Sequence, residues 1–227
     1  MNLFIHYCLP GFTNCYILGA DASDKAASAD KSPQMEQPEE ACIDAAQQDA
    51  ILIDPGVMDE EILNYIEGNN YALRGVLITH DHISHIRGLR TIQRIYKTQI
   101  YAINPHILDQ NAILLRDGEL FSIGPFNIET ITVPGHSSDS AVFRIENFLF
   151  TGDVLSAGLV GTTASSYGAA IQMTALRNKV LSLPGEFIIL PGHGPPSSMD
   201  AEKRFNAGIQ LFEQRSYRRS SFNLDFL

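Results

Sequence analysis

The chain has 227 residues and a formal net charge of -10, a length that predicts one α/β domain, although two small domains would also fit it. Its negative charge disfavours nucleic acid and anionic membranes as partners, because both carry negative charge themselves. Three cysteines without a Cys-x-x-Cys pattern predict neither a disulfide framework nor a thiolate metal site.

The N-terminal segment predicts a pair of strands. Residues 1–8 and 14–18 are rich in β-branched and aromatic side chains, and the Pro10-Gly11 turn separates them. The segment lacks the basic region of a signal peptide, and no stretch of the chain has the long apolar run of a membrane-spanning helix. We therefore expect a cytoplasmic protein.

A polar segment follows from about residue 19 to residue 48. It consists mainly of Ala, Asp, Ser, Glu, Gln and Pro, and has almost no large apolar side chain with which to offset the entropy lost on ordering. We predict a flexible insertion there, within a single domain that spans residues 1–227. The insertion could be a lid over a site or merely a mobile surface loop.

The middle of the chain alternates predicted strands with predicted helices. A strand at 50–53 ends at Asp54-Pro55-Gly56, and a helix at 58–67 is closed by Gly68 and Asn69. A second apolar strand at 74–78 precedes residues 86–96, whose apolar side chains have helical spacing. The loop between that strand and that helix is rich in histidine.

The rest of the chain predicts mainly strands. Short apolar segments at 100–103, 120–123, 126–133, 141–145 and 148–150 are separated by turn residues, a pattern typical of antiparallel hairpins. We expect a helix at 169–183, a strand at 187–190 and a closing helix at 200–214 that is capped by Asp200.

Five of the seven histidines fall in three short loops that directly follow predicted strands, where a scaffold holds functional side chains firmly. Glycines beside them allow the backbone to approach a metal ion closely. Their joint occurrence with one aspartate therefore predicts a metal site. The candidate ligands are His80, His82 and His85, then His136 in Pro-Gly-His, Asp153 in Thr-Gly-Asp, and His193 in Pro-Gly-His-Gly.

The spacing of the first histidines favours two ligands for one ion. In an extended segment alternate residues face the same way, so His80 and His82 can point together while Asp81 points away. A third imidazole, from His136, would leave one tetrahedral position for water, as in catalytic zinc sites. Asp81 would then be a hydrogen-bond partner of a ligating imidazole.

The order of these motifs resembles the metallo-β-lactamase superfamily, and within it the glyoxalase II-like hydrolases. The resemblance covers roughly residues 14–202 and rests on four motifs with Asp54-Pro55-Gly56 upstream of them. It implies an α/β fold of four αββα layers, with the site where two sheets meet. The motifs are Thr79-His80-x-His82-x-Ser84-His85, Gly135-His136, Gly152-Asp153 and Gly192-His193.

The resemblance also implies a ligand set. One metal ion would be held by His80, His82 and His136, and a second by His85 and His193. Asp153 would bridge the two ions. The cofactor would be one or two zinc ions, with iron or manganese as alternatives, and a metal-activated hydroxide would attack a small-molecule substrate.

Two departures from the family pattern concern the substrate and the second ion. Ser84 stands at the catalytic position where the family motif His-x-His-x-Asp-His has an aspartate, and a neutral hydroxyl is a poorer ligand for a divalent ion. We therefore expect a weakened second metal site. The loop Gly161-Thr162-Thr163-Ala164-Ser165 also lacks the arginine that related enzymes often carry there.

The sequence leaves three functions open. The first is a metal-dependent hydrolase of a thioester, a lactone or another ester. The second is an oxidoreductase similar to the persulfide dioxygenases, in which His80, His136 and Asp153 would hold a single iron ion. The third is a degenerate member that binds a ligand without catalysis because the carboxylate at position 84 is missing.

Overall fold

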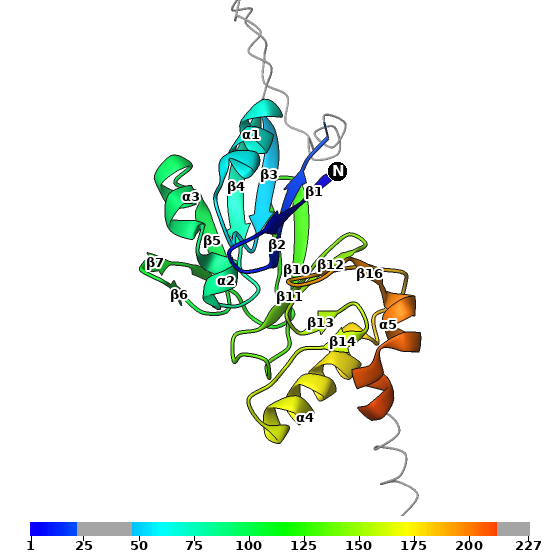
Figure 1. Cartoon of the computed structure of the whole chain (residues 1–227). Coiled ribbons are helices and arrows are strands. Elements are labelled where there is room, and N and C mark those ends of the chain that lie inside the picture. Colours follow the sequence, from blue (N-terminus) through cyan, green and yellow to red (C-terminus); the bar gives the residue numbers. More distant parts are fainter. Residues whose placement is uncertain (22–46, 213–227) are drawn as a thin grey trace, which may run out of the picture.

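The computed structural model describes residues 1–21 and 47–212, and places two six-stranded sheets face to face (Figure 1). The flexible insertion predicted at about 19–48 falls mainly on residues 22–46, which lie outside the described residues. In the described part, no helix is both long enough and apolar enough to cross a membrane.

The first sheet is mixed and carries its helices on one face. Its strands β1 and β2 form an antiparallel hairpin, whereas β3, β4, β5 and β8 run parallel to one another. The strand order is β1 (Asn2–Cys8), β2 (Thr13–Gly19), β3 (Gln48–Ile53), β4 (Tyr71–Leu77), β5 (Gln99–Ala102) and β8 (Ile113–Leu114); the helices are α1 (Glu60–Gly68), α2 (Ile83–Ile86) and α3 (Leu89–Ile95).

The second sheet is built from antiparallel hairpins, as the turn spacing predicts, with β15 added parallel to β12. The prediction is wrong for the segment at 100–103, which is β5 and runs parallel to β4 and β8 in the first sheet. Its order is β16 (Ser197–Ser198), β15 (Ile188–Pro191), β12 (Phe148–Gly152), β11 (Ala141–Ile145), β10 (Phe126–Thr132) and β9 (Leu120–Ile123). The other elements are α4 (Ser166–Ala175), the π-helix η2 (Leu176–Val180), α5 (Met199–Phe205), and two small pairs, β6 (His106–Ile107) with β7 (Gln110–Asn111) and β13 (Leu155–Ser156) with β14 (Leu159–Val160).

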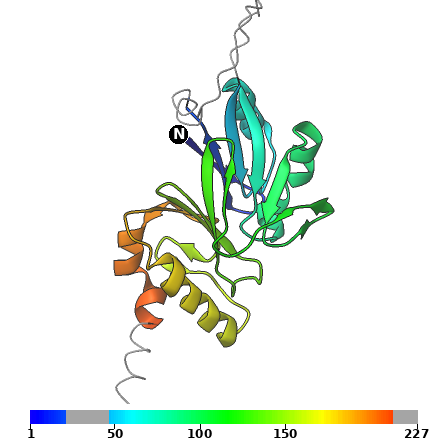
Figure 2. The ribbon, with the colours of Figure 1, turned by 180° about the vertical axis from the view of Figure 1, so that it is seen from behind.

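Three apolar clusters separate four layers, which confirms the predicted αββα sandwich (Figure 2). The cluster between the sheets holds Tyr16, Phe143 and Phe150, all fully buried. A second cluster joins the first sheet to α1, α2 and α3, and a third joins the second sheet to α4, η2 and α5. Alternate residues of each strand therefore face different apolar layers, which fixes the register.

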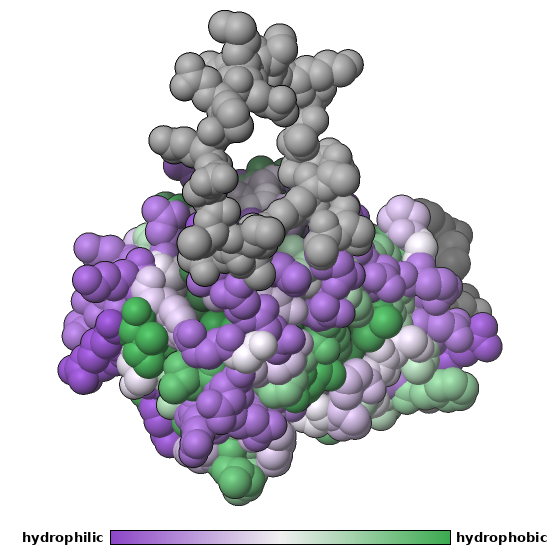
Figure 3. Space-filling view, turned by 90° about the horizontal axis from the view of Figure 1, so that it is seen from above, coloured by the Kyte–Doolittle hydropathy of each residue, from purple (hydrophilic) through white to green (hydrophobic). Residues whose placement is uncertain are grey.

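The apolar side chains that stay exposed to solvent come from several elements of the fold. On the face seen in Figure 3, hydrophobic residues form a band between hydrophilic ones. Exposed single apolar residues are normal for folded proteins, so the band by itself assigns no role.

The helix predicted at 86–96 is shorter than expected, because the chain breaks around Gly88. Helix α2 ends before this break and α3 begins after it. The amide of Gly88 donates to the Pro55 carbonyl at 2.8 Å. A Cβ at this position would lie 2.5 Å from the backbone of Val57. This close approach of two loops is a tertiary contact that helical periodicity does not reveal.

The closing helix also differs from the prediction at both ends. Ser198, rather than Asp200, caps α5 by accepting a hydrogen bond from the amide of Ala201. The helix ends at Phe205 because Asn206 is extended (φ -67°, ψ 115°), after which residues 207–212 are helical again. The Asn206 side chain donates to the buried Glu202 carboxylate at 2.6 Å, which holds this break in place.

Two buried side chains of β2 tie the two sheets together below the histidine loops. Asn14 Nδ2 donates to the carbonyls of Pro191 (2.9 Å) and Gly194 (2.7 Å). The Tyr16 hydroxyl donates to the same Pro191 carbonyl at 2.6 Å. The loop that carries His193 is therefore fixed by strand β2 of the opposite sheet.

We expect Asn14→Ala to lower the free energy of unfolding by about 1–3 kcal/mol, because it removes two hydrogen bonds of a buried side chain, to the carbonyls of Pro191 and Gly194. Tyr16→Phe should cost only about 1 kcal/mol, since the Pro191 carbonyl keeps its bond to Asn14. Urea denaturation of the two variants checks the order, and an equal loss in both would contradict it.

Candidate metal centre

The candidate ligands lie in four loops, each of which follows a strand that ends on the same side of the sandwich, near α2 and β13 (Figure 1). His80, His82 and His85 follow β4, and His136 follows β10. Asp153 follows β12, and His193 follows β15. Residues up to 113 positions apart in the chain thus meet at one point.

The first donor group consists of three imidazoles and one carboxylate. His82 Nδ1 lies 3.0 Å from His80 Nε2 and 3.1 Å from His136 Nε2. Asp153 Oδ2 lies 3.8 Å from His80 Nε2 and 3.5 Å from His136 Nε2. Ligands about 2.1 Å from a tetrahedral ion are about 3.4 Å from one another, so these spacings suit a single divalent cation.

The second donor group consists of His85, His193 and the same aspartate. Asp153 Oδ1 lies 3.2 Å from His85 Nε2, and Asp153 Oδ2 lies 3.4 Å from His193 Nε2. Asp153 therefore faces both groups, as a bridging ligand would.

In the second group, the buried atoms His85 Nε2 and Asp153 Oδ1 face each other at 3.2 Å, and neither has a hydrogen bond to any other group. Leaving a buried polar atom unpaired is costly, so such atoms require an explanation. A bound cation supplies one, because it would accept both lone pairs at once. The residues present therefore fit a metal ion in the second group as well as in the first.

Each of four imidazoles is oriented by a hydrogen bond from its other nitrogen, the arrangement that fixes the tautomer of a metal ligand. His136 Nδ1 donates to the Thr162 carbonyl at 2.8 Å, and His193 Nδ1 donates to the Phe12 carbonyl at 2.7 Å. Their Nε2 lone pairs are therefore left for the metal.

Asp54 orients the two deepest imidazoles. Its carboxylate accepts hydrogen bonds from His85 Nδ1 (3.0 Å) and from the amide (2.8 Å) and hydroxyl (2.6 Å) of Thr79. Since the Thr79 hydroxyl proton is used in this way, its oxygen accepts from His80 Nδ1 at 3.1 Å. Asp54 is buried and has a left-handed backbone (φ 50°), which directs both of its oxygens inward.

Gly192 lies beside the cluster at a position with no room for a side chain. A Cβ on Gly192 would lie 2.4 Å from Asp153 Oδ1 and 2.5 Å from His85 Cε1. Any other residue there would displace two of the candidate ligands, so the close approach predicted for the glycines beside the ligands is present at this position.

Burial and charge divide the ligands into a closed side and an open side. His80 and His85 are buried, whereas His82 is exposed and the side chain of His193 is 40% exposed. Burial and the neighbouring imidazoles lower the pKa of His80 to about 2. Burial opposes the charged form of His85 too, but Asp54 and Asp153 raise its pKa to about 10.

The pKa of Asp153 is lowered although burial alone would raise it, because His193 and His85 hydrogen-bond its carboxylate. Without metal the cluster is thus held together by protons on histidine. A divalent cation would take the place of such protons and leave the carboxylate ionised.

The structure brings together all six residues that the sequence proposes as ligands. Ser84 lies beside them at the start of α2, and a Cβ on Gly11 would be only 2.9 Å from its Cβ.

The partner predicted for a ligating imidazole is wrong: the Asp81 carboxylate accepts from Asn104 Nδ2 at 3.0 Å instead. Asp54 has the role predicted for Asp81. The sequence signal that could have identified it is its position at the end of β3, the strand next to β4.

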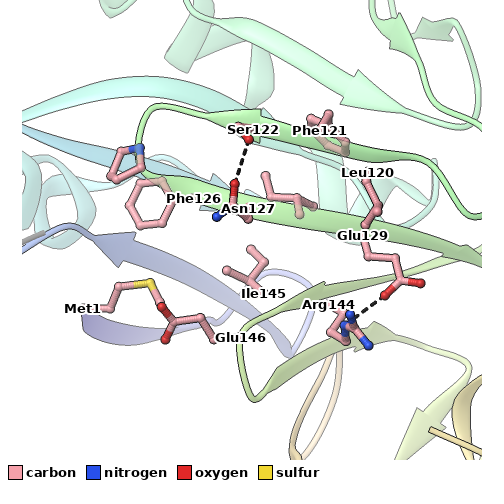
Figure 4. Close-up of a pocket in the computed structure, with 12 residues that line it drawn as sticks. Met1, Leu120, Phe121, Ser122, Phe126, Asn127, Glu129, Arg144, Ile145 and Glu146 are labelled. Atoms are coloured by element: carbon pink, nitrogen blue, oxygen red, sulfur yellow. Dashed lines mark hydrogen bonds and ion pairs between the residues drawn. The ribbon is translucent and has the colours of Figure 1, made fainter. Parts of the chain in front are cut away.

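The groove on β9, β10 and β11, of 420 Å³, is separate from this cluster, and none of the six candidate ligands lines it. Its polar side chains pair with one another: Arg144 with Glu129 at 2.9 Å, and Ser122 with Asn127 at 2.8 Å (Figure 4).

The comparison with protein families decides the assignment that this geometry suggests. A family model described as the metallo-beta-lactamase superfamily matches residues 43–193, which is more than half of the chain. The chain belongs to the metallo-beta-lactamase superfamily. Members of this superfamily bind metal ions and include many hydrolases, in accord with the two donor groups.

Three similar proteins show how far the likeness extends. A probable polyketide biosynthesis zinc-dependent hydrolase, BaeB of Bacillus velezensis, is 27% identical over 186 residues, which are 77% of this chain and 82% of that protein. A hydroxyacylglutathione hydrolase of Shewanella denitrificans is 32% identical over 154 residues, 63% of this chain and 56% of that enzyme. The crystal structure of ETHE1 from Myxococcus xanthus has the same fold, with a TM-score of 0.73 and 23% identity, covering 91% of this chain and 84% of that one.

We expect Asp54→Asn to weaken metal binding at the second group by about 10- to 100-fold. The Asn amide would direct hydrogens toward His85 Nδ1, which moves the imidazole proton to Nε2, the atom that faces the metal. Zinc titration of the chelator-treated protein measures the change.

Asp81→Asn is the matched control, because it alters a neighbouring carboxylate that contacts no candidate ligand and should leave both affinities unchanged. Equal zinc binding in Asp54→Asn and the native chain would show that Asp54 does not orient His85.

Proposed function

We propose that the protein hydrolyses a small acyl compound, with thioesters as the first substrate class and lactones or other esters as the next, and that zinc is its metal. The observation that carries the proposal is the shared carboxylate of Asp153, which faces both donor groups. The zinc-dependent hydrolase and the hydroxyacylglutathione hydrolase among the similar proteins support it.

A divalent ion bound here would lower the pKa of water and polarise the acyl carbonyl. The chain provides the surroundings for this chemistry. His82 and His193 lie on the open side, so substrate approaches from there, whereas the buried His80 and His85 close the opposite side to solvent.

Ser84 does not supply a base in this mechanism. A serine hydroxyl is neutral at pH 7. The position that holds a carboxylate in the family motif is therefore without charge, and Asp153 is the carboxylate that serves both donor groups.

We expect His82→Ala to lower metal-dependent thioesterase turnover by on the order of 100-fold or more, because one of three imidazoles of the first group is lost. Turnover of a chromogenic thioester by the zinc-loaded protein is the measurement. His106→Ala is the matched control, since His106 lies on β6 outside both groups. Unchanged turnover in His82→Ala would reject the mechanism.

We expect Ser84→Asp to raise the zinc affinity of the second group by at least about tenfold, because a charged oxygen donor joins two imidazoles and Asp153. Calorimetric zinc titration measures the affinity, and turnover should rise with it. A gain in neither would mean that the native site already works with serine.

A second candidate function is that of an iron oxidoreductase similar to the persulfide dioxygenases. The observation in its favour is that His80 Nε2 and His136 Nε2 both lie within 3.8 Å of the same oxygen, Asp153 Oδ2. His82 Nδ1 is closer to both imidazoles than that carboxylate is, which favours a four-donor site. Iron in the purified protein and oxygen uptake with glutathione persulfide would favour the oxidoreductase over the hydrolase.

A further inference from the structure

The tip of the β1–β2 hairpin lies directly against the metal centre. The Phe12 carbonyl accepts the hydrogen bond from His193 Nδ1 at 2.7 Å. Gly11 lies against Ser84, next to the histidine loop, and the Thr13 hydroxyl donates to the Ser84 carbonyl at 2.9 Å. The hairpin tip therefore has a fixed position beside the open side of the site.

Three large apolar side chains at this tip are left in solvent. Tyr7 is 51% exposed, Leu9 is 71% exposed and Phe12 is 64% exposed. The ring centroids of Tyr7 and Phe12 are 6.4 Å apart, so these two rings form one surface. Single exposed apolar residues need no explanation, but a cluster of them beside a site marks a surface that binds something apolar.

The backbone of Phe12 shows that its ring is not there for local structure. Phe12 has a left-handed conformation (φ 54°), which is unfavourable for a bulky side chain. Glycine or asparagine would present the same carbonyl to His193 with less strain. The exposed ring thus adds strain without adding to the core.

In the part of the chain that the structure describes, none of the hydrogen bonds or ion pairs of the six candidate ligands involves a lysine or an arginine. The loop from Gly161 to Ser165 contains no basic residue either. No cation is provided at these positions to bind a substrate carboxylate.

We propose that Tyr7, Leu9 and Phe12 bind an apolar chain of the substrate, and that the substrate class is a medium-chain acyl thioester or ester. The inference rests on the proposed hydrolase function and adds its specificity. Each methylene that the surface covers raises kcat/KM by about two- to fourfold, so longer acyl chains are better substrates.

A fluorescent variant tests the apolar surface without turnover. The chain contains no tryptophan, so Phe12→Trp introduces a single reporter that keeps an aromatic ring at the tip. Its emission should move to shorter wavelength when sodium octanoate is added and should stay unchanged with sodium acetate. Equal responses to both would overturn the inference.

An acyl-chain series tests the effect on catalysis. With acetyl, butyryl, hexanoyl and octanoyl thioesters, kcat/KM should rise with chain length in the native zinc enzyme. Phe12→Asn keeps the left-handed backbone and the carbonyl for His193, and should lower kcat/KM for the octanoyl substrate by about tenfold. The acetyl substrate should lose much less than the octanoyl substrate, whereas a damaged site would slow both substrates equally.

Phe205→Asn is the matched control, because it removes an equally exposed ring from α5, the helix on the outer face of the second sheet. A flat chain-length series, or equal losses in both variants, would overturn the inference while leaving the hydrolase proposal intact. An emission shift with octanoate in a protein that hydrolyses no thioester, ester or lactone would support the apolar surface and reject the hydrolase.

Discussion

The structure depends on how the fold holds several imidazole lone pairs close to the carboxylate of Asp153. His82 Nδ1 lies 3.0 Å from His80 Nε2 and 3.1 Å from His136 Nε2. Asp153 faces both donor groups. Lone pairs this close repel one another unless a cation lies between them, whether a proton or a metal ion. The loops must therefore be held from outside, by Asp54, by backbone carbonyls and by the contacts of Asn14 with the His193 loop.

The two donor groups are unequal for physical reasons. The first has four donors, three of them imidazoles, whereas the second has only His85, His193 and the shared Asp153. Each group has one ligand on the open side, His82 in the first and His193 in the second. In the second group, the buried His85 Nε2 and Asp153 Oδ1 lie 3.2 Å apart, a spacing that suits a cation even though Ser84 gives no charged donor.

The sequence predicts the candidate metal ligands better than it predicts the residues that hold these ligands in place. Alternation in an extended segment is a local rule, so the common direction of His80 and His82 could be derived from spacing. The role of Asp54 could not, because it depends on β3 lying next to β4, a long-range pairing. Likewise the break at Gly88 follows from contact with Val57, which helical periodicity does not contain. The placement of the hairpin strands was predictable from turn residues, since hairpins are local. The break at the C-terminal end of α5 was not, because it depends on the buried Glu202.

The hairpin tip connects recognition with the metal ligands through one residue. The carbonyl of Phe12 orients His193, while its ring extends into solvent beside Tyr7. The carbonyl and the ring both belong to one residue, Phe12, which has a left-handed backbone. A ligand that moves the ring would therefore also act on the backbone that orients the imidazole. His193 is the most exposed ligand of the second donor group. Substrate binding at this surface would thus bear on the geometry of the second donor group, whereas the buried His80 and His85, fixed by Thr79 and Asp54, would keep theirs.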